Sequence, residues 1–321
     1  STLASKRSVR KRSRIKMNSS VWHRVSILVV AAFLLASVPY FGSAYVIGLT
    51  LTLLMWIALT QSWVILSAMT GYISLGHAVF FGVGAYVMVL CFNTLPFLIA
   101  VILAGLVGFS FAFLVGYPCL RVRGPYFVIL TFGLAELVKF IVINVEAGLG
   151  KFGRLLLGAP GLETLYYLIL ALAVISIAIT YYVRRSRFGA GLRAIREDEE
   201  AAETLGIDVA RFKVLAFAIS ATVPSMVGAV MILRNSYFEP LDVFNPVTSF
   251  TIVSMAIIGG GDDVPGPLYG ALGLVLLQEI LWANWPEVYM IILGVLLVTF
   301  VLRLPEGIHG WILSYQRSRT T

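Results

Sequence analysis

The sequence predicts an all-α, polytopic membrane protein with about ten spans, and three observations carry that prediction. Hydrophobic residues make up 59% of the 321 residues and charged residues only 12%, a balance too apolar for a soluble domain. The apolar residues gather in runs of about 20, which is the length of helix that crosses a bilayer core. The basic residues gather outside these runs.

The apolar runs, taken in order, predict the individual spans. The run at 246–260 is short enough to be re-entrant. The runs are residues 25–41, 45–68, 73–92, 96–117, 125–145, 164–183, 214–233, 246–260, 267–283 and 286–302.

Residues 1–24 form a tail whose charged residues are all Lys or Arg. The net charge of +8 could indicate a nucleic-acid partner, but the positive excess lies in this tail, where it suits anionic lipid and fixes orientation. A secretory signal is the competing interpretation. The basic region of a secretory signal would be shorter than this tail, and further apolar runs follow residues 25–41 at once. These residues are therefore expected to be kept as a membrane span.

The distribution of basic residues predicts the orientation in the membrane. With the tail inside, an even number of spans returns residues 311–321 to the cytoplasm as a second tail, and residues 25–310 form the transmembrane domain. All of the 24 Lys and Arg residues then lie on the cytoplasmic side, except Lys139, Lys151, Arg154 and Arg234. This bias is typical of cytoplasmic loops, so both termini are expected inside.

Residues 184–213, called the polar segment below, are the one long charged interval between two apolar runs. Arg193 and Arg196 lie four residues before Glu197 and Glu200, a spacing that brings side chains together on a helix. We therefore expect one short, highly charged helix on the cytoplasmic side of the membrane.

The end of this helix is predicted at Gly206, which follows Asp198, Ala201 and Ala202. A glycine in a left-handed conformation commonly ends a helix. Such a helix could dock into a pocket of a soluble partner, or it could be a solvated connector that touches nothing. Charge and spacing alone favour the connector.

No catalytic, cofactor or metal site is predicted. The chain contains no G-x-x-x-x-G-K-[ST] phosphate loop, so it is not expected to bind ATP by itself. His23, His77 and His309 are far apart, and Cys91 and Cys119 have no metal-type spacing.

Polar residues inside the apolar runs are the candidates for a transport path. Ser74, Gly76 and His77 combine small and polar side chains, which suit either close helix packing or contact with a substrate. Glu136 and Lys139 lie three residues apart in one run, and each charge costs about 2.5–3.5 kcal/mol at a helix centre. They are expected to form an ion pair or to face a wet path.

Five stretches together resemble the permeases of bacterial branched-chain amino acid ABC importers, in particular their M-type subunit. The stretches are GYISLGHAVFFGVGA at 71–85, LRVRGPYF at 120–127 with 131–139, SRFG at 186–189 with LRAIREDEEAA at 192–202 and LGI at 205–207, GGGDDVPGPLYG at 259–270, and RLPEG at 303–307. Lys139 stands where the family has arginine.

The resemblance implies a permease of the bacterial inner membrane that performs no covalent chemistry. It implies a second, H-type permease, two cytoplasmic ATPases, a substrate-binding protein outside, and a polar segment that couples ATP hydrolysis to the import of hydrophobic amino acids such as leucine. Because the family's glycine-rich outer segment is weakly represented, a permease for urea or short amides remains an alternative. The other alternative is a secondary carrier in which Glu136 and Lys139 form a proton or ion relay.

Overall fold

The computed structural model describes residues 33–151, 153–260 and 264–288, and beyond them residues 291–292, 294–295, 298–299 and 307–310. The chain divides into two compact units, residues 1–48 and 49–321. In the first unit, residues 33–41 are helical.

Apart from one two-stranded ribbon, the regular secondary structure of the described residues is helical, as the sequence predicts. The strands β1 (Arg154–Leu155) and β2 (Tyr237–Phe238) pair antiparallel. The helices are α2 (Ala44–Thr70), α3 (His77–Cys91), α4 (Phe97–Cys119), α5 (Pro125–Gly148), α6 (Leu162–Arg185), α7 (Arg187–Glu197), α8 (Glu199–Thr204), α9 (Val209–Asn235), α10 (Pro240–Val243), α11 (Pro246–Gly259) and α12 (Pro265–Asn284).

Seven helical stretches of the described chain are long and apolar enough to cross a membrane. They correspond to seven of the predicted runs: α2, α4, α5, α6, α9, α12, and the pair α10–α11, which together cover Pro240–Gly259. The run at 286–302 is described only in part, and residues 25–32 of the first run lie outside the described residues, as do the tails at 1–24 and 311–321.

The predicted span at 73–92 is wrong at its start. Residues 71–76 are not helical, and α3 begins at His77 and has only 15 residues. Gly71 adopts a φ of +79°, a left-handed conformation that ends α2 and turns the chain. The apolar run is continuous through this break, which is why hydropathy alone misses it.

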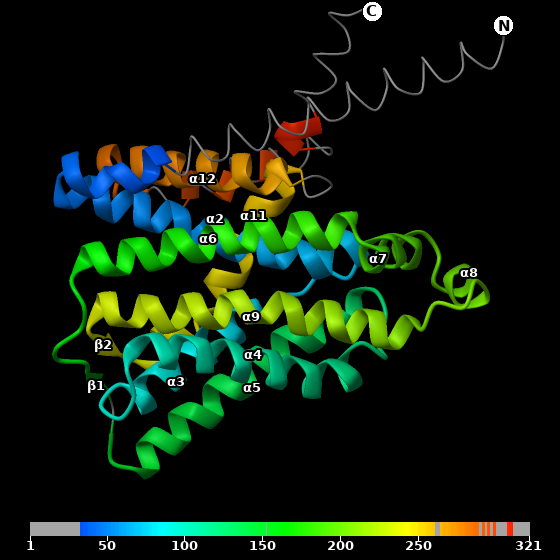
Figure 1. Cartoon of the computed structure of the whole chain (residues 1–321), viewed down its shortest axis with the longest axis horizontal. Helices are drawn as coiled ribbons and strands as arrows, with labels where there is room; N and C mark the ends of the chain where they lie inside the picture. Colours follow the sequence, from blue (N-terminus) through cyan, green and yellow to red (C-terminus); the bar gives the residue numbers. More distant parts are fainter. Residues whose placement is uncertain are drawn as a thin grey trace, which may run out of the picture. The chain divides into compact units, whose positions relative to one another are not determined.

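Helix α9 is the centre of the described fold, with α3 and α4 packed along it (Figure 1). A side chain at Gly84 of α3 would overlap the backbone of Ser225, and one at Gly108 of α4 would overlap the Ser225 side chain. Farther along, Gly228 of α9 lies against the backbone of Phe81. Small residues let helices approach this closely, and such packing drives helix association in lipid.

The two ends of α9 carry different structures. Helices α7 and α8 lie at its N-terminal end, and the β1–β2 ribbon lies at its C-terminal end (Figure 1). A helix of 27 residues is about 40 Å long. The polar segment and the ribbon are therefore separated by the length of a membrane-spanning helix.

We predict that Gly84→Ala disrupts the contact of α3 with α9, because the new methyl group would collide with backbone atoms that cannot move aside. Overpacking of this kind costs about 1–3 kcal/mol. The midpoint of thermal unfolding and the yield of monodisperse protein in detergent should both fall.

The matched control is Gly133→Ala in α5, where an added methyl group meets no atom within 4 Å. It should leave the midpoint unchanged or raise it, since alanine is favoured over glycine in a helix by up to about 1 kcal/mol. Equal midpoints for the two variants would contradict the close packing of α3 on α9.

Candidate functional site

The polar segment folds into two short helices, and the expectation of a single charged helix is wrong. Asp198 is extended, with φ −159° and ψ 116°, and it separates α7 from α8. Its carboxylate accepts hydrogen bonds from the backbone N–H groups of Glu200 and Ala201, as an N-cap does. Arg196 and Glu200 consequently lie on different helices.

The prediction for Gly206 is confirmed. Its φ is +83°, and the amide that follows, that of Ile207, donates to the carbonyl of Ala202 across the turn. Ala202 is buried with Ile195 and Val209 in a small apolar cluster, whereas Ala201 is exposed. The segment thus has an apolar side that holds α7, α8 and the start of α9 together.

Two arginines tie α7 to neighbouring helices. Arg193 donates to the carbonyl of Arg184 at 2.9 Å, and Arg196 donates to the carbonyl of Ala68, near the end of α2, at 2.8 Å. Arg196, Glu197, Asp198 and Glu200 line a cleft of about 930 Å³. Its other wall comes from residues 70–73 and from the start of α5.

Glu199 is the centre of a group that sequence reasoning missed. The hydroxyl of Tyr72 donates to its Oε1 at 2.5 Å, and Nζ of Lys213 donates to the same oxygen at 3.1 Å and to the Tyr72 hydroxyl at 2.9 Å. Nη2 of Arg123 lies 2.9 Å from Oε2. We call Tyr72, Arg123, Glu199 and Lys213 the inner cluster.

The inner cluster is largely buried, except for Arg123, whose side chain is 60% exposed. The side chains of Glu199 and Lys213 are only 11% and 5% exposed, and Tyr72 is buried. Burial, together with the hydrogen bond to Glu199, raises the pKa of Tyr72 far above its ordinary value, so its hydroxyl remains a donor. Removing one partner from a buried ion pair costs about 3–5 kcal/mol, because the other charge is left uncompensated.

The inner cluster joins four parts of the chain, of which only α8 and the start of α9 are near each other in sequence. Glu199 begins α8, Lys213 lies in the first turns of α9, Tyr72 follows α2, and Arg123 lies between α4 and α5. No local spacing marks such a set, and Glu199 is one of several acids in the run 197–200. Only its partial burial distinguishes it from exposed Glu197 and Glu200.

The second group of predicted site residues lies in the break before α3 and at the first residue of that helix. Ser74, Gly76 and His77 are buried there. Side chains of other helices bond to backbone groups that lack helical partners: Trp63 donates to the carbonyl of Ser74 at 2.9 Å, and the Leu75 amide donates to Thr131 at 3.2 Å. Non-helical backbone at membrane depth requires such partners.

His77 is the first residue of α3 and is fully buried. Among the described residues, neither ring nitrogen has a hydrogen-bond partner. The ring stands edge-on to Phe80, with ring centroids 5.8 Å apart.

Glu136 and Lys139 form an ion pair on α5, one of the two arrangements expected from the sequence, with an N–O distance of 2.5 Å. The Lys139 side chain is 11% exposed and that of Glu136 28%. Within the described interactions, this pair shares no hydrogen bond or ion pair with Ser74, Gly76 or His77. The structure therefore forms two separate polar sites here.

A third group, which sequence reasoning also missed, lies at the β1–β2 end. Arg154 of β1 donates to both carboxylate oxygens of buried Glu146, at 2.6 and 2.8 Å, and the Tyr86 hydroxyl donates to the same carboxylate at 2.9 Å. The hydrogen bonds to Glu146 raise the pKa of Arg154. We call Tyr86, Glu146 and Arg154 the outer cluster.

Comparison with known proteins places the chain in a family. A family profile described as "Branched-chain amino acid transport system / permease component" matches residues 45–301. The chain belongs to this family. It is a multi-pass membrane permease component rather than a catalytic enzyme.

Individual relatives of this permease agree with the family match. The branched-chain amino acid permease protein LivM of Salmonella typhimurium is 27% identical over 318 residues, covering 88% of this chain and 73% of the relative. LivH of Escherichia coli is 26% identical over 57% of this chain and 59% of the relative. The fructose import permease FrcC of Rhizobium meliloti is 24% identical over 46% and 41%. No solved structure matches the permease.

We predict that Glu136 and Lys139 act as a structural ion pair. Glu136→Gln should lower the yield of folded permease, because Lys139 then stays buried without its counter-charge. The double variant Glu136→Gln with Lys139→Gln should recover part of that yield, since no unpaired charge remains. Yield and uptake are measured on the same membranes.

A different result is expected if Glu136 and Lys139 form the proton or ion relay of a secondary carrier. If Glu136→Gln and the double variant both reach normal yield but lose uptake, the carboxylate acts in transport and the structural pair is wrong. Lys139→Arg keeps the charge and should retain both yield and uptake.

Proposed function

We propose that this chain is one of two permease subunits of an ATP-driven importer for branched-chain amino acids in the bacterial inner membrane. The observation that carries the proposal is the family match over residues 45–301, combined with a polar segment that is built into the helical core. Both termini would lie in the cytoplasm, with about ten spans in the complete subunit.

The basic residues around α7 and α8 support a cytoplasmic location for the N-terminal end of α9. Arg121 and Arg123 follow α4, and Arg184, Arg185 and Arg187 stand where α6 passes into α7. Basic residues beside span ends remain in the cytoplasm. The β1–β2 ribbon, at the opposite end of α9, would then face the side from which a substrate-binding protein delivers its cargo.

Partners must supply the energy, because the chain has no phosphate-loop motif. Two cytoplasmic ATPases would press on α7 and α8 when they close around ATP. The residues of the polar segment that we assign to this contact are Arg193, Arg196, Glu197, Asp198, Glu200, Ala201, Ala202 and Gly206. The inner cluster then connects the movement of α8 to α2, α5 and α9.

A second, H-type permease would complete the path. Relatives of both the LivM and LivH types match this chain. Helices α4 and α5 also expose large apolar side chains, among them Leu114, Leu137 and Phe140. Such faces suit lipid and a helical partner.

The proposal is tested by reconstituting the two permeases and two ATPases in proteoliposomes together with the binding protein. We expect ATP-dependent uptake of labelled leucine and none of labelled urea. Uptake of urea instead of leucine would favour the amide permease. Leucine uptake by this chain without ATPases, driven by an ion gradient, would establish the secondary carrier.

We predict that Gly206→Val uncouples the importer. A side chain at φ +83° costs about 1–2 kcal/mol even though the space around it is open, so the strain shifts the end of α8. The assembled complex should still hydrolyse ATP, while leucine uptake per ATP falls sharply. Both rates are measured on the same proteoliposomes.

Gly206→Asn is the matched control, because asparagine tolerates the left-handed conformation. It should retain most of the coupling. Uptake per ATP that is normal in Gly206→Val would mean that the segment is a solvated connector.

A further inference from the structure

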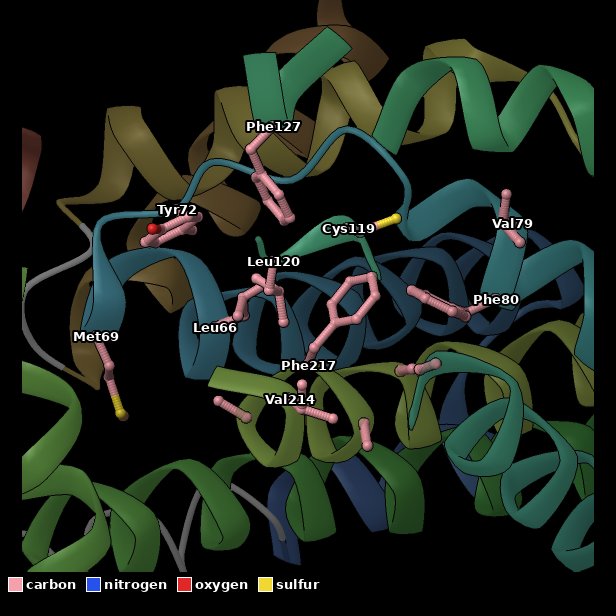
Figure 2. Close-up of a cluster of buried hydrophobic side chains, with 14 of the residues drawn as sticks. Leu66, Met69, Tyr72, Val79, Phe80, Cys119, Leu120, Phe127, Val214 and Phe217 are labelled. Carbon is pink, nitrogen blue, oxygen red and sulfur yellow. The ribbon is translucent and has the colours of Figure 1, made fainter. Parts of the chain in front are cut away.

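A continuous column of rings leads from the inner cluster into the helical core. Tyr72 stands edge-on to Phe127 at 5.2 Å between ring centroids, Phe127 to Phe217 at 6.4 Å, and Phe217 to Phe80 at 5.2 Å. Phe80 in turn contacts His77. Figure 2 shows the four rings from Tyr72 to Phe80 within one buried cluster. We call these five residues the ring column.

The ring column begins at the polar segment. The Tyr72 hydroxyl is fixed by Glu199 of α8 and by Lys213, and the ammonium group of Lys213 also lies 4.5 Å from the centroid of the Tyr72 ring. The first residue of α8 therefore bonds directly to the first ring of the column.

The middle of the ring column has little free space. Phe80, Phe127 and Phe217 are each 0% exposed, and they come from α3, α5 and α9. A side chain at Gly116 of α4 would lie only 2.9 Å from the Phe217 ring. Because interiors packed this closely switch between discrete arrangements and do not deform continuously, a shift of one ring must move the next.

The ring column ends at the N-terminus of α3. The backbone N–H of Ala78, next to His77, donates to the side chain of Ser249 on α11 at 2.9 Å. The Leu75 amide donates to Thr131 of α5. The first turn of α3 is thus the place where the break at 71–76 meets two further helices.

We propose that Tyr72, Phe127, Phe217 and Phe80 are positioning residues of the transport cycle, which transmit the position of α8 to His77 and the first turn of α3. This inference rests on the proposed function, in which ATPases move α8. Beyond the proposed function, it names the side chains that would transmit the movement of α8 and the segment that the movement would reach. The break at 71–76 becomes the element that opens or closes the path.

The first test measures leucine uptake per ATP hydrolysed in the reconstituted importer. Tyr72→Phe removes only the hydroxyl, and Phe127→Leu removes only a ring. Each should lower the ratio by about two- to thirtyfold, the range of coupling changes seen along connected residues. Because both changes interrupt one route, the double variant should be no worse than the worse single variant.

Phe244→Leu is the matched control, because it removes an equally buried ring outside the column. It should lower the midpoint of thermal unfolding but keep the uptake ratio. Unchanged ratios in Tyr72→Phe and Phe127→Leu would overturn the proposal. So would an equal loss in Phe244→Leu.

A second test needs no transport, so it separates this inference from the proposed function. Amide hydrogen exchange is measured on the purified chain in detergent. Tyr72→Phe should speed exchange in residues 78–81, whereas Tyr86→Phe, which removes the equivalent hydroxyl from the outer cluster, should not. If the importer takes up no leucine, the proposed function fails while this exchange still decides the inference. Unchanged exchange in Tyr72→Phe overturns it.

Discussion

Close packing around Ser225 of α9 is the constraint on which the described core depends. Lipid is as apolar as a leucine side chain, so burial of apolar surface gives the helices little reason to associate. The helices must therefore associate through close, complementary packing. Gly84 of α3 and Gly108 of α4 allow it, because they leave room for Ser225. These three helices fix one another. The polar segment lies at one end of α9 and the β1–β2 ribbon at the other.

Each end is held by a buried carboxylate with a tyrosine hydroxyl and at least one basic group. Glu199 joins α8 to Tyr72, Arg123 and Lys213, and Glu146 joins β1 to α5 and α3. A buried charge that loses its partners costs several kcal/mol. Short, irregular segments that would otherwise move freely are therefore fixed to the core. In the proposed importer, a push on α8 would be transmitted to the core through the contacts of Glu199 with Tyr72, Arg123 and Lys213.

The sequence predicts those features that depend on local rules. Run lengths identify seven of the membrane helices, and the left-handed Gly206 follows from its place after α8. The sequence does not predict features that depend on contacts between helices. The break at 71–76 lies within an unbroken apolar run, and its backbone is satisfied by Trp63 and Thr131 from other helices. In the sequence Glu199 resembles its acidic neighbours. Only the fold brings Tyr72, which is 127 residues away, and Lys213 within hydrogen-bond distance of its carboxylate.

The central claim is that α8 and the loop after α2 move as one body when ATP binds. It is tested most directly by the distance between spin labels on exposed Glu203 of α8 and exposed Ile73, in the assembled importer with Cys91 and Cys119 replaced. The expected result is the same distance in the nucleotide-free and ATP-bound complexes, and a change in both states once Glu199→Gln is introduced. A distance that shifts on ATP binding in the unmodified importer would contradict the claim, because α8 would then move without the core.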